Sequence, residues 1–394
     1  MATLHHWLLP TGIDELPPPH ADHLERLRRT LLDLYRSWGY ALILPPFIEY
    51  MESLLVNGGD DLALRTFKVT DLHSGRTLGI RADITPQAAR IDAHKIQRDT
   101  PTRLCYCGTV LHTRAEEPSV SRAPLQLGAE LYGHDGRESE LEILALMIQT
   151  LQLCGINEFY LDLGHVGIFR SLARQLQLSE EVELTLFEAL QRKAVPEIEA
   201  QLAALDLSHE AGAMLAALAE LSGDDALEQA TTRLAAAAPE VQQALTELRT
   251  LAHQLKRRFP EIDPHFDLAE LRGYHYHTGV VFAGFVPRLG REVVRGGRYN
   301  EFGRTFGRAR PAVGFSGDLL TLFRIGERSD EGGKPAIFAP WQEDPALQQR
   351  IAQLRATGRR VVQQLPGAEG DATAHGCGEH LVAHGTTWEP VALP

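Results

Sequence analysis

The feature that most constrains the fold is a helical block set between segments with strand patterns. From about residue 168 to 258, Ala, Leu, Glu and Gln dominate the sequence and Gly is nearly absent. Strand patterns precede this block and return in the stretch PHFDLAELRGYHYHTGVVFAGF, which begins at Pro264. Because the strand patterns that precede the block resume after it, we expect one sheet with strands from both segments, and the helical block as an insertion within that larger domain.

The segments before the block predict a hairpin and a helix. Residues 103–111 and 124–133 have strand patterns and are separated by a charged, turn-rich stretch. Residues 138–153 have apolar positions at helical spacing, so an amphipathic helix is expected there. Its apolar stripe comprises Leu141, Leu144, Ile148 and Leu151.

A second domain is predicted at the C-terminal end. The stretch RSDEGGK, residues 328–334, has the composition of a linker. After it, the pattern predicts a small strand–helix–strand unit. The expected organisation is a larger domain over residues 1–325, which includes the insertion, and a small α/β domain over residues 334–394.

The net charge argues against nucleic acid as a main partner. Asp and Glu total 52 against 39 Lys and Arg, which gives a net charge of −13, whereas proteins that bind nucleic acid carry basic surfaces. The sequence has no run of about 18 apolar residues, and its N-terminus lacks a basic region followed by a sustained apolar stretch. We therefore expect no membrane association and a cytoplasmic location.

Generic catalytic and metal motifs are missing from the sequence. It contains no G-x-x-x-x-G-K-[ST] loop, no H-E-x-x-H helix and no G-x-S-x-G elbow. Its four cysteines include no Cys-x-x-Cys pair, so neither a disulfide framework nor structural zinc is expected. His275 and His277 could share one face of a strand, but no third metal ligand lies near them in the sequence. No metal site is predicted.

Polar residues interrupt three strand patterns that are otherwise apolar. Burying such groups costs free energy unless partners or a ligand satisfy them. Together they have the composition of a pocket for a zwitterion, with acids for an ammonium, arginine for a carboxylate and aromatic groups for a polar side chain. On spacing alone, strand-end residues that pair with one another are equally compatible. The three clusters are Arg81, Asp83 and Thr85; Gln126 and Glu130; and Arg272, Tyr274, Tyr276 and His277.

Five segments resemble, in the same order, the signatures of histidyl-tRNA synthetase. They are RLCYCG, QLGAELYG, LRGYHYHTGVVF, GGRYNEFG and PAVGF, and the resemblance covers roughly residues 5–325. It implies an α+β fold: a class II synthetase-like antiparallel sheet flanked by helices, with the helical insertion and the small C-terminal α/β unit. The stretch GYALILPPF resembles motif 1, which builds the dimer interface in class II synthetases.

The resemblance also implies a histidine pocket. The ammonium-binding acid of the family falls on Asp83, which is shortened from glutamate, and one tyrosine of the family's aromatic pair has become His277. The residue types that a histidine pocket requires are otherwise retained. Carried over position by position, the implied histidine-binding residues are Asp83, Thr85, Gln126, Glu130, Arg272, Tyr276, His277 and Tyr299.

Both ATP-clamping arginines of the synthetase family are missing. The motif 2 arginine position is His112, and the motif 3 arginine position is Thr321, with Leu320 in place of the preceding glutamate. Adenylyl transfer depends on fixed cationic groups that stabilise developing charge, so their loss should remove several kcal/mol of transition-state stabilisation. We therefore expect no catalytic residues and no cofactor.

A synthetase-like body that keeps its amino-acid pocket but lacks these arginines is similar to the regulatory subunits of ATP phosphoribosyltransferase, the first enzyme of histidine biosynthesis. This resemblance implies a hetero-oligomer with a short catalytic subunit, L-histidine as the feedback effector and a homodimer as the building block. The alternatives are a divergent histidyl-tRNA synthetase with relocated ATP contacts and a free-standing histidine sensor.

Overall fold

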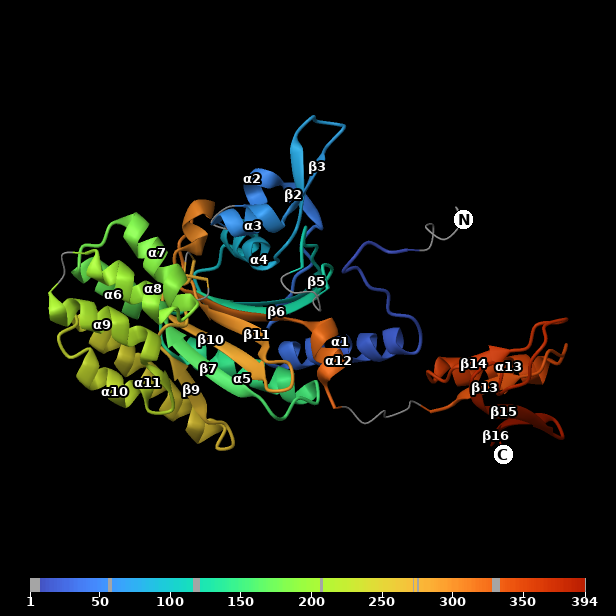
Figure 1. Cartoon of the computed structure of the whole chain (residues 1–394). Helices are drawn as coiled ribbons and strands as arrows, with labels where there is room; N and C mark the ends of the chain where they lie inside the picture. Colours follow the sequence, from blue (N-terminus) through green and yellow to red (C-terminus); the bar gives the residue numbers. More distant parts are fainter. Residues whose placement is uncertain are drawn as a thin grey trace. The chain divides into compact units, whose positions relative to one another are not determined.

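The computed structural model describes residues 8–55, 59–115, 121–205, 208–271, 273–274, 276–327 and 334–393. The chain divides into two units, Met1–Glu327 and Arg328–Pro394 (Figure 1). Among the residues described, no helix has the length and apolar character needed to cross a membrane.

The larger unit is built on a nine-stranded sheet. In order across the sheet, its strands are β1 (Ala41–Leu42), β5 (Thr102–Thr109), β6 (Leu125–Tyr132), β12 (Ala312–Asp318), β11 (Arg291–Arg298), β10 (Val280–Val286), β7 (Tyr160–His165), β9 (Pro264–Asp267) and β8 (Ser222–Gly223). The pairs β1–β5 and β7–β9 are parallel, and the other neighbours are antiparallel. The predicted hairpin is confirmed as β5 and β6. Strands from before and after the helical insertion pair directly, as β7 with β10.

Three helices pack on one face of this sheet: α1 (His20–Ser37), α5 (Glu138–Leu153) and α12 (Leu319–Ile325) (Figure 1). Helix α5 has the predicted bounds, but the prediction of a single apolar stripe is wrong. All six residues from Ile143 to Ile148 are buried. The reason is that α5 lies between the sheet and the helices α1 and α11 (Pro239–Arg258), so little of it faces solvent.

A second, smaller layer lies over the opposite face of the sheet (Figure 1). It includes a three-stranded antiparallel sheet in the order β2–β4–β3. Helix α4 runs into a π-helical turn, and a 3₁₀ helix packs against both. The elements are β2 (Ile48–Tyr50), α2 (Met51–Leu54), α3 (Gly59–Arg65), β3 (Phe67–Thr70), β4 (Thr77–Ile80), α4 (Thr85–Ile91), the π-helical turn η2 (Asp92–Ile96) and the 3₁₀ helix η3 (Phe302–Phe306).

The described residues of the insertion form a bundle of six helices at one end of the sheet (Figure 1). Serine residues mark two of its helix starts: the Ser179 side chain accepts a hydrogen bond from the Val182 N–H, and the Ser208 side chain accepts one from the Ala211 N–H. The helices are α6 (Val166–Gln175), α7 (Glu180–Gln191), α8 (Val195–Ala203), α9 (His209–Glu220), α10 (Ala226–Arg233) and α11.

The smaller unit contains the predicted strand–helix–strand motif. Strands β13 (Ala336–Ala339) and β14 (Val361–Gln363) are parallel, as expected for strands joined through a helix, here α13 (Pro345–Ala356). The hairpin of β15 (Cys377–His384) and β16 (Thr387–Ala392) extends the sheet in the order β14–β13–β15–β16. Asp344 caps α13 and also accepts a hydrogen bond from the Trp388 indole at 2.7 Å.

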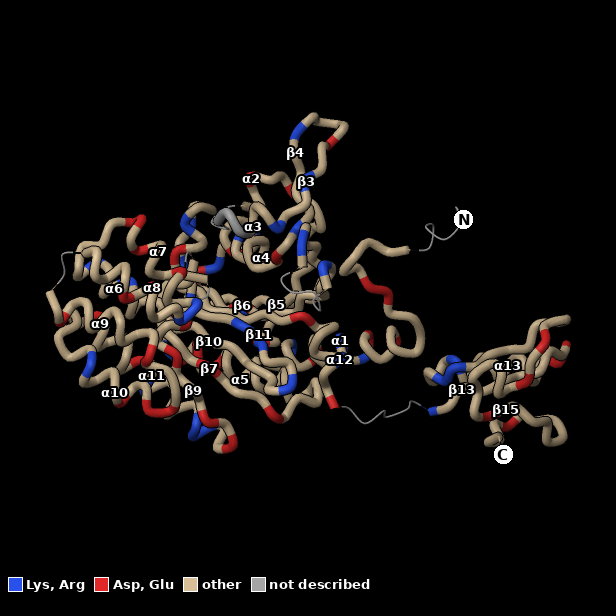
Figure 2. The backbone as a smooth tube through the Cα atoms, in the orientation of Figure 1, with Lys and Arg blue, Asp and Glu red and all other residues tan. Residues whose placement is uncertain are grey.

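Acidic and basic residues are interspersed through both units (Figure 2), and two of the ion pairs in the larger unit are almost fully buried. Arg310 donates to both carboxylate oxygens of Asp92, at 2.9 and 3.0 Å, and to the Thr100 carbonyl at 2.8 Å. Arg298 pairs in the same way with Glu140. Arg298 thus connects the end of β11 to α5, and Arg310, just before β12, connects to the π-helical turn η2.

We expect Arg310→Leu to lower the free energy of unfolding by about 3–5 kcal/mol, because it leaves the Asp92 carboxylate buried without its cation. The matched control is Arg304→Ala, which breaks the exposed pair with Glu301 and should cost about 1 kcal/mol or less. Urea denaturation followed by circular dichroism measures both values. Equal losses in the two variants would contradict the expectation.

Candidate functional site

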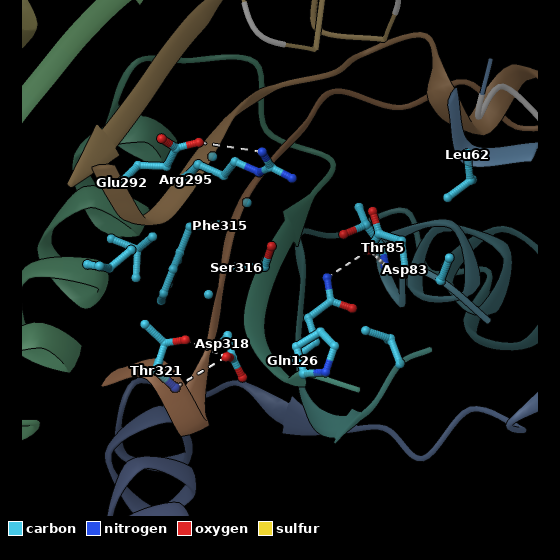
Figure 3. A pocket seen from close by; sticks show the side chains of 18 of the residues that line it. Leu62, Asp83, Thr85, Gln126, Glu292, Arg295, Phe315, Ser316, Asp318 and Thr321 are labelled. Carbon is cyan, nitrogen blue, oxygen red and sulfur yellow. Dashed lines mark hydrogen bonds and ion pairs between the residues drawn. The ribbon is translucent and has the colours of Figure 1, made fainter. Parts of the chain in front are cut away.

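A cavity of about 220 Å³ lies between the large sheet and the smaller layer (Figure 3). Seven of the eight residues predicted for histidine binding line it, and the eighth, Arg272, lies outside the described residues. Drug-sized ligands usually occupy about 300–1,000 Å³, so this cavity has the size for one smaller molecule. The seven residues are Asp83, Thr85, Gln126, Glu130, Tyr276, His277 and Tyr299.

Strand β6 supplies one wall because its residues alternate between two environments. Gln126 and Glu130 line the cavity, whereas Leu127 and Leu131 are buried in the hydrophobic core. Gly314 on β12 pairs with Glu130 across the sheet. A Cβ atom on Gly314 would lie 1.6 Å from Glu130 Oε2, so only glycine leaves room for this carboxyl group.

Hydrogen bonds hold the Asp83 carboxylate in place. Gln126 Nε2 donates to Asp83 Oδ1 at 2.7 Å (Figure 3), and the Thr85 N–H donates to the same oxygen at 2.9 Å. The other end of the Gln126 amide, Oε1, accepts from the Ile84 N–H at 2.9 Å. The amide thus bridges β6 and the segment that carries Asp83. The result is a fixed acidic group on the cavity wall, which suits a cationic partner.

Glu130 is the most deeply buried acid of the site, with 1% of its surface exposed. Tyr106 donates to its Oε1 at 2.9 Å, and Tyr299 donates to its Oε2. Burial raises the pKa of Glu130 to about 8, although the two tyrosine hydrogen bonds act in the opposite direction. Near neutral pH this carboxyl group can therefore either donate or accept a hydrogen bond.

Tyr276 and His277 form an aromatic wall, with their ring centroids 4.1 Å apart. Burial lowers the pKa of His277 to about 3, so its imidazole is neutral near pH 7. Its Nδ1 lies 3.2 Å from the Arg298 carbonyl oxygen. Because a carbonyl only accepts, the proton is on Nδ1, and Nε2 is left as an acceptor.

His112 and Thr321, the positions predicted from the resemblance to have lost ATP-clamping arginines, line the same cavity, and both form internal hydrogen bonds. His112 Nε2 lies 3.0 Å from the Ala82 carbonyl. Thr321 Oγ1 donates to Asp318 Oδ2 at 2.6 Å (Figure 3), and Asp318 also caps helix α12 through backbone N–H groups. An acid therefore stands beside the position where the synthetase family has an arginine.

Two residues of the polar clusters in the sequence do not line the cavity. Arg81 is buried and donates to the carbonyls of Thr109 and Pro45, at 2.9 and 2.8 Å. Tyr274 faces the helical insertion, where its hydroxyl donates to Glu183. These two residues are therefore satisfied outside the cavity, but by backbone carbonyls and by a glutamate of the insertion, and not by other members of the polar clusters.

Several charged residues of the cavity were not predicted from the sequence. Arg65 comes from α3, and Arg291, Glu292 and Arg295 come from β11. Glu292 and Arg295 form an ion pair, with 3.6 Å between Glu292 Oε1 and a terminal guanidinium nitrogen of Arg295 (Figure 3). The signal for the β11 residues was present in the polar positions of REVVRGGR, at residues 291–298. No comparable sequence signal marks Arg65.

Comparison with known proteins links the two units to different family models. The family model described as histidyl-tRNA synthetase matches residues 12–322, and the model of the ATP phosphoribosyltransferase subunit HisZ C-terminal domain matches residues 334–391. The ATP phosphoribosyltransferase regulatory subunit of Thioalkalivibrio sulfidiphilus is 54% identical, with 96% of each chain covered. That of Pseudomonas aeruginosa PAO1 is 52% identical over the whole of both chains.

Solved structures support the same relationship. An ATP phosphoribosyltransferase regulatory subunit/histidyl-tRNA synthetase from Bacillus halodurans has a TM-score of 0.83 and 28% identity, with 95% of this chain and 97% of that chain covered. A histidyl-tRNA synthetase from Nostoc shares the fold, with a TM-score of 0.75, 19% identity, and 95% of this chain and 91% of that chain covered. The chain therefore belongs to the family of ATP phosphoribosyltransferase regulatory subunits, built on the histidyl-tRNA synthetase fold.

Proposed function

We propose that this chain acts in the cytoplasm, binds L-histidine in the cavity and communicates its occupancy to a short catalytic subunit of ATP phosphoribosyltransferase, without catalysis of its own. The family membership supports the catalytic partner. The observation that carries the proposal is that one cavity gathers the retained amino-acid-binding positions together with both lost ATP positions.

The chemistry of the described lining suits two polar parts of histidine, the α-ammonium group and the imidazole. The Asp83 carboxylate is placed to receive the α-ammonium group, because it is fixed by Gln126 and faces the cavity. Glu130 lies in the aromatic part of the cavity, where a neutral carboxyl or a carboxylate can pair with either nitrogen of an imidazole. Arg272 is proposed for the ligand carboxylate on the family resemblance alone.

The other part of the cavity argues against adenylation. Transfer of an adenylyl group needs cations fixed against the phosphates, and the arginine positions are occupied by His112 and Thr321. The Asp318 carboxylate accepts a hydrogen bond from Thr321, so an acid stands beside one of these positions. The arginines that line the cavity, Arg65, Arg291 and Arg295, stand at neither of them. This supports a regulatory role and disfavours the divergent synthetase. The excess of acidic over basic residues in the insertion disfavours a sensor of tRNA.

Feedback requires that histidine binds one conformation of the assembly better than another. A ligand with equal affinity for both conformations shifts nothing. In the proposed mechanism, closure of the cavity around histidine favours the conformation in which the catalytic subunit is inhibited.

An apolar strip on the larger unit supports a homodimer as the building block. It follows the motif 1 segment, where Leu42, Leu44, Phe47 and Ile48 are all exposed and Leu44 is 81% exposed. Contiguous exposed apolar residues of this kind are typical of an interaction surface. The proposed occupant is a second copy of this chain, as the motif 1 resemblance implies.

The test of the proposed function is phosphoribosyltransferase activity of the short catalytic subunit from the same source, assayed with and without this chain and titrated with histidine. We expect activation that histidine reverses. In Asp83→Asn the amide keeps an acceptor for Gln126 but loses the negative charge. Hydrogen bonds to charged groups contribute about 1.5–3 kcal/mol, so half-inhibition should need roughly tenfold to hundredfold more histidine.

The matched control is Asp71→Asn in the β3–β4 turn, where Asp71 also accepts backbone hydrogen bonds. This variant should keep the wild-type response. Undiminished histidine sensitivity in Asp83→Asn would exclude the cavity as the inhibitory site. Histidine-dependent ATP turnover by this chain alone, with no activation of the catalytic subunit, would instead identify a divergent synthetase.

Glu130→Gln should separate binding from stability. Because the pKa of Glu130 is raised from 4.5 to about 8 on folding, the unfolded chain releases this proton first, and folding becomes less favourable as pH rises through that interval. We therefore expect the free energy of unfolding of Glu130→Gln, measured relative to that of the wild type, to be higher at pH 8 than at pH 5 by about 2 kcal/mol or more. Urea denaturation at both pH values measures the gain, and calorimetry should show weaker histidine binding. A constant stability difference would refute the expectation.

Leu44→Asp should convert the homodimer to monomers, because a charged residue would then be buried at the centre of the apolar strip. Light scattering after size exclusion reports the mass, and a monomer has 43.6 kDa. Leu365→Asp, at an exposed leucine of the smaller unit, is the control and should leave the mass unchanged. A dimer in Leu44→Asp would show that another surface is used.

A further inference from the structure

The loop between β9 and β10 lies between the cavity and the helical insertion. It spans residues 268–279, of which all but 272 and 275 are described. On one side it presents Tyr276 and His277 to the cavity. On the other side its Tyr274 contacts α6 and α7 of the insertion. One short segment therefore contacts both the proposed histidine site and the helical bundle.

Tyr274 is held by the insertion through several kinds of contact. Its ring stacks on Phe187 of α7, with centroids 5.0 Å apart and an interplanar angle of 28°. Its hydroxyl donates to Glu183, one turn away on the same helix. Arg170 of α6 places its guanidinium 4.7 Å from the ring centroid and donates to the Tyr274 carbonyl at 2.6 Å. These contacts fix both the side chain and the backbone at this position.

The link from Tyr274 to the cavity is short and tight. The Gly273 carbonyl accepts from the N–H groups of Tyr276 and His277, at 2.9 and 2.8 Å. Gly273 has a φ of 68°, which favours glycine, and a Cβ there would lie 2.5 Å from His277 Cδ2. Gly273, the neighbour of Tyr274, therefore contacts the aromatic wall directly, so a displacement of Tyr274 is transmitted to Tyr276 and His277 through these hydrogen bonds.

A second contact fixes the start of the same loop. Just after α7, the Lys193 Nζ lies 2.7 Å from Asp267 Oδ2 and donates to Ser222 Oγ at 3.2 Å. Asp267 Oδ1 accepts from the Ala269 N–H at 3.0 Å. The insertion therefore holds the loop at two points, seven positions apart in the sequence.

We propose that Tyr274 is a positioning residue through which the helical insertion and histidine binding are energetically coupled. The inference deepens the proposed function and rests on histidine binding in the cavity. The insertion holds the loop in the arrangement that forms the aromatic wall, and histidine in turn stabilises the contacts of Tyr274 with α7. Histidine must have this effect if the insertion affects histidine binding, because coupling between two sites is reciprocal.

The test combines two single variants, their double variant and a control in the full chain. Tyr274→Phe removes the hydroxyl and Glu183→Gln removes the charge that it contacts, and neither residue lines the cavity. Isothermal titration with L-histidine should show about fivefold or more weaker binding for each. The double variant should bind histidine about as well as the single variant with the lower affinity, because both substitutions break the same interaction. Glu188→Gln, at an exposed position of α7, should bind as wild type does.

Hydrogen exchange supplies a readout that loss of packing alone would not change. Histidine should slow amide exchange in α7 of the wild-type chain, and this protection should disappear in Glu183→Gln. Wild-type affinity in both single variants, with no protection of α7 by histidine, would overturn the coupling while the histidine site stands. If the wild-type chain itself binds no histidine, the proposed function fails and the coupling fails with it.

Discussion

The central sheet can carry a polar cavity on one face only because its other face is densely packed with apolar side chains. Alternate residues of β6 point to opposite sides, so Leu127 and Leu131 enter the core formed with α1, α5 and α12, while Gln126 and Glu130 face the cavity. Burial of the apolar face offsets the free energy lost by keeping a carboxyl group such as Glu130 away from water. The site therefore depends on the packing behind it.

Much of the site could be predicted from the sequence because strand periodicity and the order of the motif segments carry over directly into space. Seven predicted residues line one cavity, although they come from segments as far apart as Asp83 and Tyr299. Periodicity fails where the chain is not a strand. Tyr274 and Tyr276 lie in turns, so they face different partners although they are two positions apart. The burial of α5 on more than one side was also not predictable from its own sequence, because no local pattern shows that α11 packs against it.

The wall around His112 and Thr321 is internally hydrogen-bonded. His112 contacts a backbone carbonyl, and Thr321 completes the cap of α12 with Asp318. These hydrogen bonds satisfy the polar groups of both side chains. A single substitution back to arginine at residue 321 would meet the Asp318 carboxylate and would lose the threonine hydrogen bond.

The burial of α5 has a consequence for the synthesis of the chain. This helix ends at Leu153, but its partners β12 and α11 are encoded much later, up to Asp318. At about 5–20 residues per second, its apolar surface emerges from the ribosome roughly ten to thirty seconds before the last strand that covers it. During that interval the apolar residues of this segment lack part of the surface that buries them in the folded chain, and exposed hydrophobic surface of this kind favours aggregation.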